Sequence, residues 1–339
     1  MNIAILGGGS WSIALSVLLA GKNHAVRMWE FDKNDAAMLA RQREHPKKLP
    51  GIKIPPSVAV TNDIREALES AEYVLCVVPS QTTRNTCKTL VAAMDKASLD
   101  KIKGWIIASK GIECGTLKIM SEVLVDEIPG LSADRIVVLS GPSLAAEVSH
   151  GIPTTVVAAS TNLDLAKIIQ KEFSTHTFRI YTNTDVKGVE LAASIKNVIA
   201  LAAGICDGLG LGANTKGALL TRGMAEIVRL GIKMGAQEQT FFGLAGMGDL
   251  ITTCTSTLSR NHTMGELIAS GLSLKEALSR TIMVAEGVET ARSVHELAKK
   301  YGIVMPISEE VYKVLFEGTP VKETIKNLML REHRPERWG

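Results

Sequence analysis

The sequence predicts an α/β domain built on a doubly wound sheet, followed by an all-helical domain. Up to about residue 185, short apolar runs alternate with helical patterns at the spacing of β–α–β crossovers. After Asp185 strand patterns largely stop, and helical patterns follow one another through the second half. We therefore expect domains at residues 1–185 and 186–339, with a ligand site in the cleft between them.

Composition excludes several classes of function. The chain has 339 residues, of which 46% are hydrophobic and 22% charged, as in an ordinary globular protein large enough for more than one core. The 38 basic and 35 acidic residues leave a formal net charge of only +3. Neither this balance nor the 4% of aromatic residues favours nucleic-acid binding. We expect no nucleic-acid partner.

The cysteines and the apolar runs indicate location. The five cysteines form no C-x-x-C pair, and an odd number fits a reducing compartment better than a disulfide framework or a metal site. The N-terminus shows no secretory signal, and the longest uninterrupted apolar run, Val198–Ile205, is too short to span a membrane. These observations predict a cytoplasmic protein with no membrane span and no metal.

The first structural unit of the chain carries a nucleotide-binding pattern. A short apolar strand, Asn2–Leu6, ends in Gly7-Gly8-Gly9 and is followed by an apolar helix, Ser10–Ala20. Gly7 and Gly9 let the backbone approach a pyrophosphate, and the first amides of the helix supply donors. A second strand ends at Glu30, about 20 residues on, where a Rossmann unit places its ribose-binding carboxylate. Ser12 replaces the third glycine of the usual fingerprint.

Further strands and helices complete the predicted sheet. The remaining strands are expected at Tyr73–Val78, Trp105–Ser109, Ile136–Ser140, Pro153–Ser160 and Phe178–Tyr181. The helices between them are expected at Asp63–Ser70, Thr82–Met94, Thr116–Val125 and Leu163–Phe173. The strands are apolar almost throughout, as in a parallel sheet covered on both faces. Lys110 and Gly141-Pro142-Ser143 follow two of these strands directly, at the edge where parallel sheets bind ligands.

The helical half contains one lysine in an apolar helix. Its helices are expected at Val186–Ile205, Lys216–Met234, Glu238–Leu244, Thr263–Ser270, Leu274–Thr281, Val288–Tyr301, Ser308–Glu317 and Val321–Leu330, before a loosely ordered charged tail at Arg331–Gly339. Lys196 is the single charged residue between Leu191 and Ala203. Burial lowers the pKa of an ammonium and makes it a candidate proton donor, unless a carboxylate keeps it charged. The alternative is a lysine whose stem packs while its head reaches water.

Two further segments of this half carry polar side chains. Gly246-Met247-Gly248-Asp249 brings a carboxylate through a flexible turn, although Asp249 could instead be a helix N-cap. Ser259-Arg260-Asn261 flanks a guanidinium with hydrogen-bonding side chains, as recognition of a phosphate or carboxylate requires. Together these residues suit hydride transfer to a small phosphorylated ketone, with Lys196 as proton donor, Asp249 orienting it and Arg260 with Asn261 holding the phosphate. Glycines 204, 208, 210 and 212 would let a loop approach this substrate closely.

The motifs resemble those of the NAD(P)-dependent glycerol-3-phosphate dehydrogenases of the bacterial biosynthetic type. The matching segments occur in order along almost the whole chain: 5–11, 109–111, 140–147, 196–200, 207–214, 221–226, 246–250, 259–261, 284–287 and 305–306. The resemblance implies reduction of dihydroxyacetone phosphate to sn-glycerol 3-phosphate with NAD(P)H, for phospholipid synthesis, by a cytoplasmic homodimer. By position, Lys196 would be the catalytic proton acceptor and donor.

The resemblance also implies the roles of individual residues. The catalytic residues would be Lys196 and Asp249. The substrate would be bound by Lys110, Gly141, Ser143, Lys196, Asp249, Ser259, Arg260 and Asn261, supported by Asn197 and Thr253. The cofactor would be bound by Gly7, Gly9, Ser10, Trp11, Lys48, Lys110, Ala145, Arg260, Val284 and Glu286.

Departures from the family pattern leave alternatives open. Ser12 stands in place of a glycine and Leu144 in place of a frequent phenylalanine, for which we expect adjusted packing. Glu30 would bond the ribose diol of NADH and repel the extra phosphate of NADPH, whereas Arg41, Arg43, Lys47 and Lys48 could neutralise that phosphate. The alternative functions are another two-domain dehydrogenase, acting on a hydroxyacid, a sugar acid or an acyl thioester, and a silent dinucleotide-binding sensor.

Overall fold

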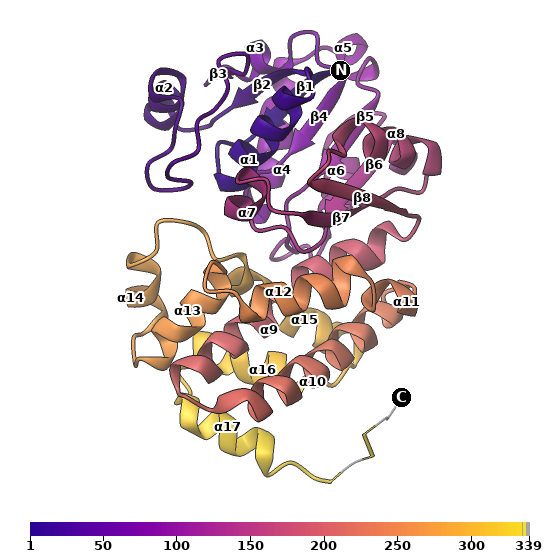
Figure 1. Ribbon diagram of the computed structural model, residues 1–339. Coiled ribbons are helices and arrows are strands. Elements are labelled where there is room, and N and C mark those ends of the chain that lie inside the picture. Colours follow the sequence, from indigo (N-terminus) through magenta and orange to yellow (C-terminus); the bar gives the residue numbers. More distant parts are fainter. Residues whose placement is uncertain (334, 337–339) are drawn as a thin grey trace. The chain divides into compact units, whose positions relative to one another are not determined.

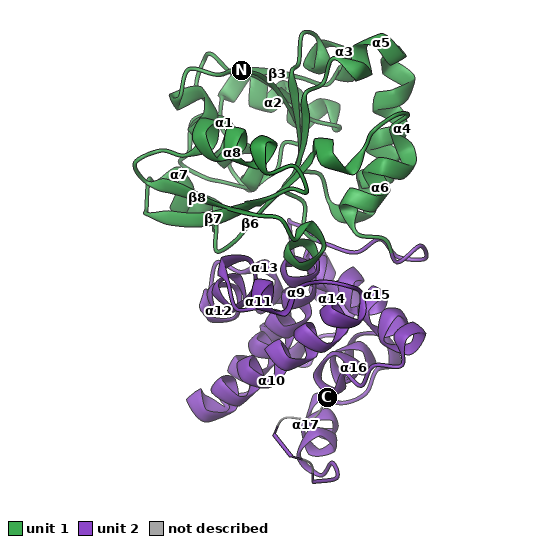
Figure 2. Ribbon diagram, turned by 90° about the vertical axis from the view of Figure 1, so that its right-hand side faces the viewer, with its two compact units in different colours: residues 1–110, 118–190 green, residues 111–117, 191–339 purple. Residues whose placement is uncertain are grey.

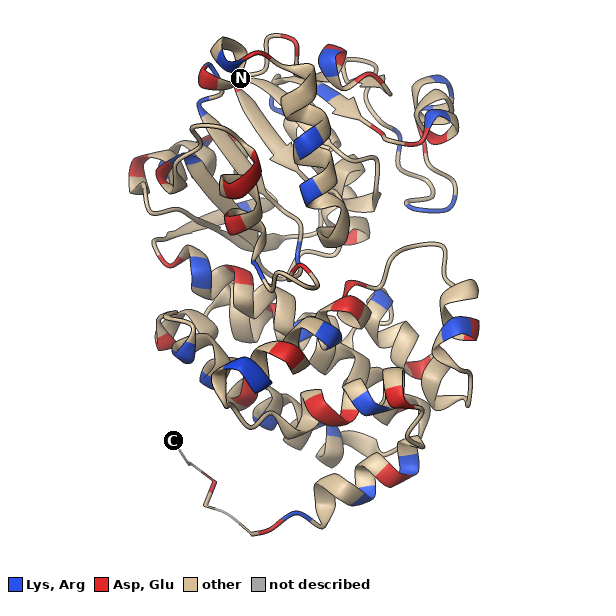
Figure 3. Ribbon diagram, turned by 180° about the vertical axis from the view of Figure 1, so that it is seen from behind, with Lys and Arg blue, Asp and Glu red and all other residues tan. Residues whose placement is uncertain are grey.

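The computed structural model describes residues 1–333 and 335–336. The chain divides into two compact units (Figures 1 and 2). Unit 1 comprises residues 1–110 and 118–190, and unit 2 comprises residues 111–117 and 191–339. Of the charged tail that the sequence predicts, residues 334 and 337–339 lie outside the described residues. Both basic and acidic residues occur along the elements of each unit (Figure 3).

Unit 1 contains an eight-stranded sheet in the order β3-β2-β1-β4-β5-β6-β7-β8. The strands are β1 (Asn2–Leu6), β2 (Ala25–Trp29), β3 (Ala59–Thr61), β4 (Tyr73–Cys76), β5 (Gly104–Ile107), β6 (Ile136–Ser140), β7 (Thr154–Ala159) and β8 (Phe178–Asn183). The six strands from β3 to β6 in this order are parallel, whereas β7 runs antiparallel to β6 and β8 runs parallel to β7. The parallel part of the sheet therefore ends at β6.

Helices cover both faces of this sheet (Figure 2). They are α1 (Ser10–Gly21), α2 (Lys33–Gln42), α3 (Ile64–Leu68), α4 (Thr83–Ala93), α5 (Lys96–Asp100), α6 (Met120–Glu127), α7 (Ala145–Ser149) and α8 (Leu163–Phe173). Buried residues of α1, α7 and α8 join one core with alternate strand residues such as Ile3 and Ile5. Helix α4 packs against α6. This is the doubly wound α/β arrangement that the sequence predicts.

Four features of unit 1 differ from the sequence prediction. Strand β3 is only three residues long, too short to give a pattern, and α2 and α7 begin after loops with little apolar periodicity. The reversal at β7 follows from a direct turn through α7, which is too short to carry the chain back for another parallel strand. Helix α6 begins at Met120 instead of Thr116, because the Glu122 carboxylate accepts a hydrogen bond from the Ile119 amide and so caps the N-terminus of the helix there.

The regular elements described in unit 2 are helices, as predicted. They are α9 (Val186–Gly208), which begins in unit 1, α10 (Gly212–Lys233), α11 (Glu238–Phe241), α12 (Asp249–Thr255), α13 (Arg260–Ala269), α14 (Leu274–Ser279), α15 (Glu286–Tyr301), α16 (Pro306–Tyr312) and α17 (Val321–Met329). π-helical turns occupy Leu244–Gly248 and Lys313–Glu317. The Glu226 carboxylate of α10 accepts hydrogen bonds from the Ile307 and Ser308 amides, at 2.7 and 3.1 Å, and so caps the N-terminus of α16.

Helix α9 is apolar on almost every face. By length and composition it reaches what a membrane span requires, with a mean hydropathy of 1.6 in its most apolar window, contrary to the sequence expectation. However, 94% of that window is buried inside the structure. The apolar residues of α9 therefore pack inside the protein, as those of a buried helix do.

Glycines allow α9 and α13 to cross closely. A Cβ on Gly204 would lie 1.9 Å from the carbonyl oxygen of His262, and a Cβ on Gly265 would lie 2.2 Å from that of Leu201. Gly208 likewise meets Ala269. The expectation that Gly204 and Gly208 form a substrate loop is wrong, because both belong to α9 and are required by helix packing. Gly210 lies in the turn that follows and Gly212 begins α10, and both have positive φ.

We predict that Gly204→Ala destabilises the protein by about 3 kcal/mol, because the added methyl forces the backbones of α9 and α13 apart. Gly217→Ala is the control, since Gly217 lies in α10 with no atom within 4 Å of an added Cβ. That change should stabilise by about 0.5–1 kcal/mol through the entropy of the unfolded chain. Urea unfolding of the two variants measures both effects, and equal midpoints would contradict the close crossing.

Within unit 1, the buried carboxyl group of Glu190, on α9, contacts the start of α6. The Ser121 amide donates to its Oε1 at 3.0 Å, and the Ser121 hydroxyl donates to its other oxygen. Glu190 is 4% exposed. Burial raises its pKa from 4.5 to about 7, despite these hydrogen bonds. The carboxyl therefore gains a proton more readily in the folded protein than in the unfolded chain.

This pKa predicts a pH dependence of stability. A raised folded-state pKa stabilises the fold fully below pH 4.5, and this stabilisation is lost as the pH rises through about 7. The difference between the two pKa values corresponds to about 3 kcal/mol of unfolding free energy. Glu190→Gln, which keeps the shape and removes the titration, should become more stable relative to the wild type as the pH rises from 5 to 8. Denaturant unfolding over that range tests this, and parallel curves would show that Glu190 does not titrate there.

Candidate functional site

The glycine turn between β1 and α1 has the conformation that a dinucleotide requires. Gly7 has a φ of +116°, and a Cβ there would lie 3.0 Å from the Val77 carbonyl oxygen. Gly9 is the N-cap of α1, without a side-chain hydrogen bond, and nothing lies within 4 Å of the position of its Cβ. The first amides of this 12-residue helix are thus left without a capping side chain. The turn fits the pyrophosphate of a dinucleotide.

Ser12 and Trp11 lie behind this turn. Ser12 is fully buried, and its Oγ, which has no hydrogen-bond partner, is 3.3 Å from where a Cβ of Gly7 would be. A small residue is therefore required at position 12, and serine fits. The Trp11 ring lies 6.4 Å from that of Phe178. Ser10 is the first residue of α1.

The carboxyl ends of the central strands meet at one edge, as expected. Residues Leu6, Cys76, Ile107 and Val138 are in register across β1, β4, β5 and β6. Just beyond them the Gly141 carbonyl oxygen accepts hydrogen bonds from the Lys110 ammonium at 3.3 Å and the Ser143 hydroxyl at 2.9 Å.

Gly141 has a φ of +147° and no room for a side chain, since an added Cβ would meet Val156 at 2.9 Å. Ala145 begins α7, which packs against α1. The structure thus brings together Lys110, Gly141 and Ser143, and sets Ala145 on a helix beside α1.

Lys48 is engaged elsewhere in unit 1. Its ammonium lies 2.8 Å from a carboxylate oxygen of Asp35, which also contacts His45 at 3.3 Å. This cluster ties the loop after α2 to that helix. Its role in cofactor binding stays a prediction.

The central site of unit 2 is a buried ion pair. The Lys196 ammonium of α9 lies 2.5 Å from Oδ1 of Asp249 and 2.5 Å from the hydroxyl of Thr253, both on α12. The exposed fractions of these three residues are 4%, 2% and 7%. The alternative in which the head of Lys196 reaches water is therefore wrong, and the lysine is buried against a carboxylate, as the pairing with Asp249 predicts.

The structure excludes the alternative that Asp249 is a helix N-cap. It is the first residue of α12, with Gly248 as N-cap, so it is not itself the cap. The preceding glycines form a π-helical turn instead of a flexible one, and a Cβ on Gly246 would lie 2.0 Å from the Phe241 carbonyl oxygen. This tight packing fixes where the helix starts. Asp249 can therefore aim its carboxylate inward at Lys196.

The Ser259-Arg260-Asn261 segment forms the start of α13 and meets the start of α15. Ser259 is the N-cap of α13, and its hydroxyl oxygen accepts from the His262 amide at 3.3 Å. Oδ1 of Asn261 accepts from the Gly287 amide at 2.9 Å, so Asn261 caps α15, whose own N-cap residue makes no side-chain bond. The Arg260 guanidinium donates to the Val284 carbonyl oxygen at 3.1 Å.

The same junction includes α9. A Cβ on Gly287 would lie 2.6 Å from the Asn197 carbonyl oxygen. Residues 196–197, 259–261 and 284–287, which are far apart in the sequence, therefore meet within unit 2. Glu286, the first residue of α15, belongs to this group.

Comparison with known proteins agrees with this geometry. The family model described as the NAD-dependent glycerol-3-phosphate dehydrogenase N-terminus matches residues 2–166, and the C-terminus model matches residues 185–326. A glycerol-3-phosphate dehydrogenase [NAD(P)+] of Chlorobium phaeobacteroides is 48% identical over all of both chains. That of Pelodictyon phaeoclathratiforme is 47% identical over 99% of this chain and all of its own. The crystal structure of glycerol-3-phosphate dehydrogenase from Coxiella burnetii has a TM-score of 0.92 and 35% identity, covering 97% of this chain and 99% of that one.

This chain belongs to the NAD-dependent glycerol-3-phosphate dehydrogenase family. The resemblance drawn from the motifs is confirmed, as is the fold class. The chain is an oxidoreductase of a family that uses NAD(P)H.

The sequence analysis gave no role to two residues, Asp207, which it quoted within the matching segment 207–214, and Phe31. Asp207 of α9 accepts from Lys216 at 2.6 Å and contacts Nε2 of His262 at 2.7 Å, which ties the end of α9 to α10 and α13. A charged residue just before the glycines of 208–212 was the available signal. Phe31 follows Glu30 and is 78% exposed, although it is aromatic. The signal available in the sequence was an aromatic residue directly after Glu30, the carboxylate of the nucleotide-binding pattern.

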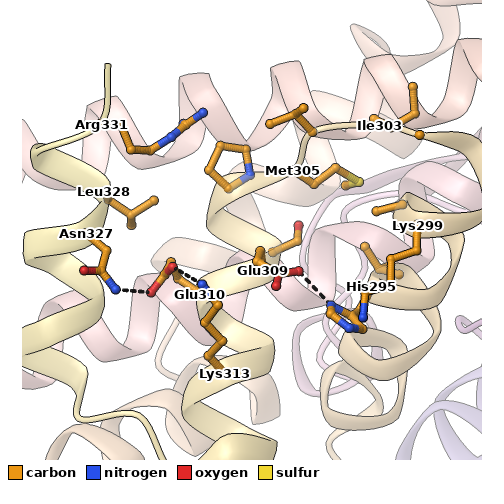
Figure 4. Close-up of a pocket in the computed structure, with 16 residues that line it drawn as sticks. His295, Lys299, Ile303, Met305, Glu309, Glu310, Lys313, Asn327, Leu328 and Arg331 are labelled. Carbon is orange, nitrogen blue, oxygen red and sulfur yellow. Dashed lines mark hydrogen bonds and ion pairs between the residues drawn. The ribbon is translucent and has the colours of Figure 1, made fainter. Parts of the chain in front are cut away.

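One cavity, of about 570 Å³, lies in unit 2 among α15, α16 and α17 (Figure 4). None of its described lining residues is among the predicted site residues. Its acidic side chains are already paired, Glu309 with His295 at 2.7 Å and Glu310 with Lys313 at 2.8 Å. We assign it no part in the reaction.

The ion pair predicts a non-additive stability effect. Asp249→Leu alone, or Lys196→Met alone, leaves the partner charge buried and unpaired and should cost about 3–5 kcal/mol. Lys196→Met combined with Asp249→Leu removes both charges and should cost clearly less. Asp164→Ala is the control, since Asp164 pairs with Lys167 at the surface and should cost about 1 kcal/mol or less. Urea unfolding of the variants measures these costs, and a double variant as unstable as the sum of its single changes would contradict the coupling.

Proposed function

We propose that this protein reduces dihydroxyacetone phosphate to sn-glycerol 3-phosphate with NAD(P)H and so supplies glycerophospholipid synthesis. The observation that carries the proposal is the buried cluster of Lys196, Asp249 and Thr253. Membership of the family and the names of the relatives support the substrate. A silent sensor would have no need for a charged pair in an apolar core, since such a pair is costly to bury.

In unit 1, the chain would hold the dinucleotide through its glycine turn. Gly7 and Gly9 would admit the pyrophosphate, and the amides at Ser10 and Trp11 would donate to it. The exposed Phe31 ring offers an apolar face for the adenine. When bound, the cofactor supplies the hydride that reduces the carbonyl carbon. Lys110 and Ala145 would complete the binding of its nicotinamide end.

In unit 2, Lys196 would provide the proton. As the carbonyl oxygen gains negative charge, the Lys196 ammonium would transfer one proton to it and become a neutral amine. The Asp249 carboxylate and Thr253 hydroxyl fix the position of Nζ before and after this transfer. Asp249 also favours the charged form of the lysine, which is the form that can donate. Reprotonation from solvent would return the enzyme to its starting state.

The phosphate of the substrate would be held by Arg260, Asn261 and Ser259 in unit 2. Because Oδ1 of Asn261 already accepts from Gly287, the amide group of Asn261 is oriented and its NH₂ would be the part that donates. The guanidinium of Arg260 supplies the charge. Lys110, Gly141 and Ser143 would bind the substrate from unit 1.

The proposal includes a homodimer in the cytoplasm. Its support is the resemblance to the family. The absence of a nucleic-acid partner, a metal and a membrane span belongs to the same proposal.

The test is oxidation of NADH and NADPH by the purified protein with dihydroxyacetone phosphate, followed by absorbance. The wild type should turn over, and Lys196→Ala should lower kcat by about 10²–10⁴-fold while cofactor binding is retained. Lys187→Ala is the matched control, because Lys187 lies on the same helix and pairs with Glu122 at 3.6 Å. No turnover by the wild type would refute the substrate, and normal turnover by Lys196→Ala would refute the proton donor.

A further inference from the structure

The His262 side chain is buried beside the proposed phosphate-binding segment, Ser259–Asn261. It belongs to α13, directly after Asn261, and is 3% exposed. Its Nε2 lies 2.7 Å from Oδ2 of Asp207, near the C-terminal end of α9. Because an ionised carboxylate only accepts hydrogen bonds, the imidazole is the donor in this contact. The side chain of His262 therefore joins the start of α13 to the end of α9.

Asp207 is held in place from a third helix. The Lys216 ammonium, on α10, donates to the same carboxylate oxygen at 2.6 Å. Although burial alone would raise it, the pKa of the Asp207 carboxyl is held below its usual range by the hydrogen bonds from Lys216 and His262. The group is therefore charged at neutral pH and oriented by two donors, which makes it a fixed point for the imidazole.

Asp207 supplies the hydrogen bond that orients the ring. The other ring nitrogen of His262, Nδ1, is buried and makes no hydrogen bond among the residues that the structure describes. Oε2 of Glu266 lies 3.6 Å from Nδ1, which is too long for a hydrogen bond. Loss of the contact with Asp207 would thus leave the imidazole without a hydrogen bond in this part of the chain, which is a costly state for a buried polar group.

The backbone of His262 meets α9 as well. A Cβ on Gly204 would lie 1.9 Å from its carbonyl oxygen, and its amide donates to the Ser259 hydroxyl at 3.3 Å. Gly204 and Asp207 lie about one helical turn apart on α9, so they make neighbouring contacts on one face of that helix. The start of α13 is therefore docked on α9 at two points, one through the backbone and one through the imidazole.

The same helix carries the proposed proton donor. Asp207 follows Lys196 by roughly three turns, at about 3.6 residues a turn, so both project from nearly the same side of α9. Arg260 and Asn261 directly precede His262 in the chain. A substrate whose carbonyl lies at Lys196 and whose phosphate lies at Arg260 and Asn261 requires a fixed distance between these groups. The docking of α13 on α9 sets this distance.

We infer that His262 and Asp207 are positioning residues, which hold the phosphate-binding segment Ser259–Asn261 at a fixed place on α9. Neither is a catalytic residue, since neither is placed against the reacting atoms. Because Lys196 belongs to α9 itself, loss of the contact should weaken binding of the phosphate and leave the proton donor in place. The inference rests on the proposed function and deepens it by adding two residues that act on the substrate through others.

The test is steady-state reduction of dihydroxyacetone phosphate by the purified full-length protein with saturating reduced cofactor. His262→Leu should raise KM for dihydroxyacetone phosphate by about 10–100-fold, because a hydrogen bond to a charged group is worth about one to two tenfold steps in affinity. The kcat and the affinity for the cofactor should change little. His262→Gln should restore most of the KM, since its amide can donate to Asp207. His262→Phe is a second variant should the leucine fail to fold.

A second buried histidine provides the matched control. His295 of α15 is 6% exposed, its Nδ1 lies 2.7 Å from a carboxylate oxygen of Glu309, and it lines the cavity among α15, α16 and α17. His295→Leu should lower the stability by a similar amount, measured by urea unfolding, and leave KM unchanged. Asp207→Ala should raise KM as His262→Leu does, and the double variant should raise it no further, since the two residues act through one contact.

The outcomes separate this inference from the proposed function. An unchanged KM in His262→Leu overturns the inference, as does an equal rise in His295→Leu, which would show a general effect of lost stability. A wild type that does not reduce dihydroxyacetone phosphate refutes the proposed function instead. In that case calorimetric titration with sn-glycerol 3-phosphate decides the inference: about tenfold weaker binding by His262→Leu than by the wild type supports it, and equal or absent binding overturns it.

Discussion

The ion pair between Lys196 and Asp249 is the constraint on which unit 2 depends. Two charges that are 4% and 2% exposed are tolerated only when they face each other with good geometry, so α9 and α12 must be held in register. The π-helical turn before Asp249 and the contact of Gly246 with the Phe241 backbone fix the start of α12. Lys196 is fixed by the packing of α9, through the apolar surface of this helix and through its close crossing with α13 at glycine residues.

The polar contacts around this pair belong to the same packing. Asn261 caps α15 while it stands beside Arg260, and Gly287 is needed because the Asn197 backbone passes so close. Residues that the family motifs mark as functional are thus also structural here, since the helix starts that expose amides and side chains to a ligand must themselves be anchored. Two other helix starts are anchored in the same way, by a buried carboxylate that accepts from backbone amides: Glu226 anchors the start of α16 and Glu190 anchors the start of α6.

Much of the fold could be predicted because periodicity and glycine position are local properties. The turn at Gly7–Gly9, the helix 163–173 and the change to helices after Asp185 all follow from short-range patterns. Strand β3 and helix α7 could not be predicted, because three to five residues give no period. The direction of β7 depends on how short the connection through α7 is, which sequence patterns do not reveal. The roles of Gly204 and Gly208 were misread, because glycine marks close approach without saying to what.

The sequence by itself determined the family, the nucleotide turn and the residue types of the candidate site, because these are carried by motifs whose order along the chain is enough to identify them. Only the tertiary structure decided which of those residues meet. It paired Lys196 with Asp249 and Thr253, and it joined Asn261 to the start of α15. It also bonded Arg43 to the Val58 carbonyl oxygen and Lys48 to Asp35 of α2, while no cation pairs with Glu30 among the residues that the structure describes. The physical reason is that the chemistry of a charged side chain depends on the neighbour that neutralises it, and that neighbour is often far away in the sequence.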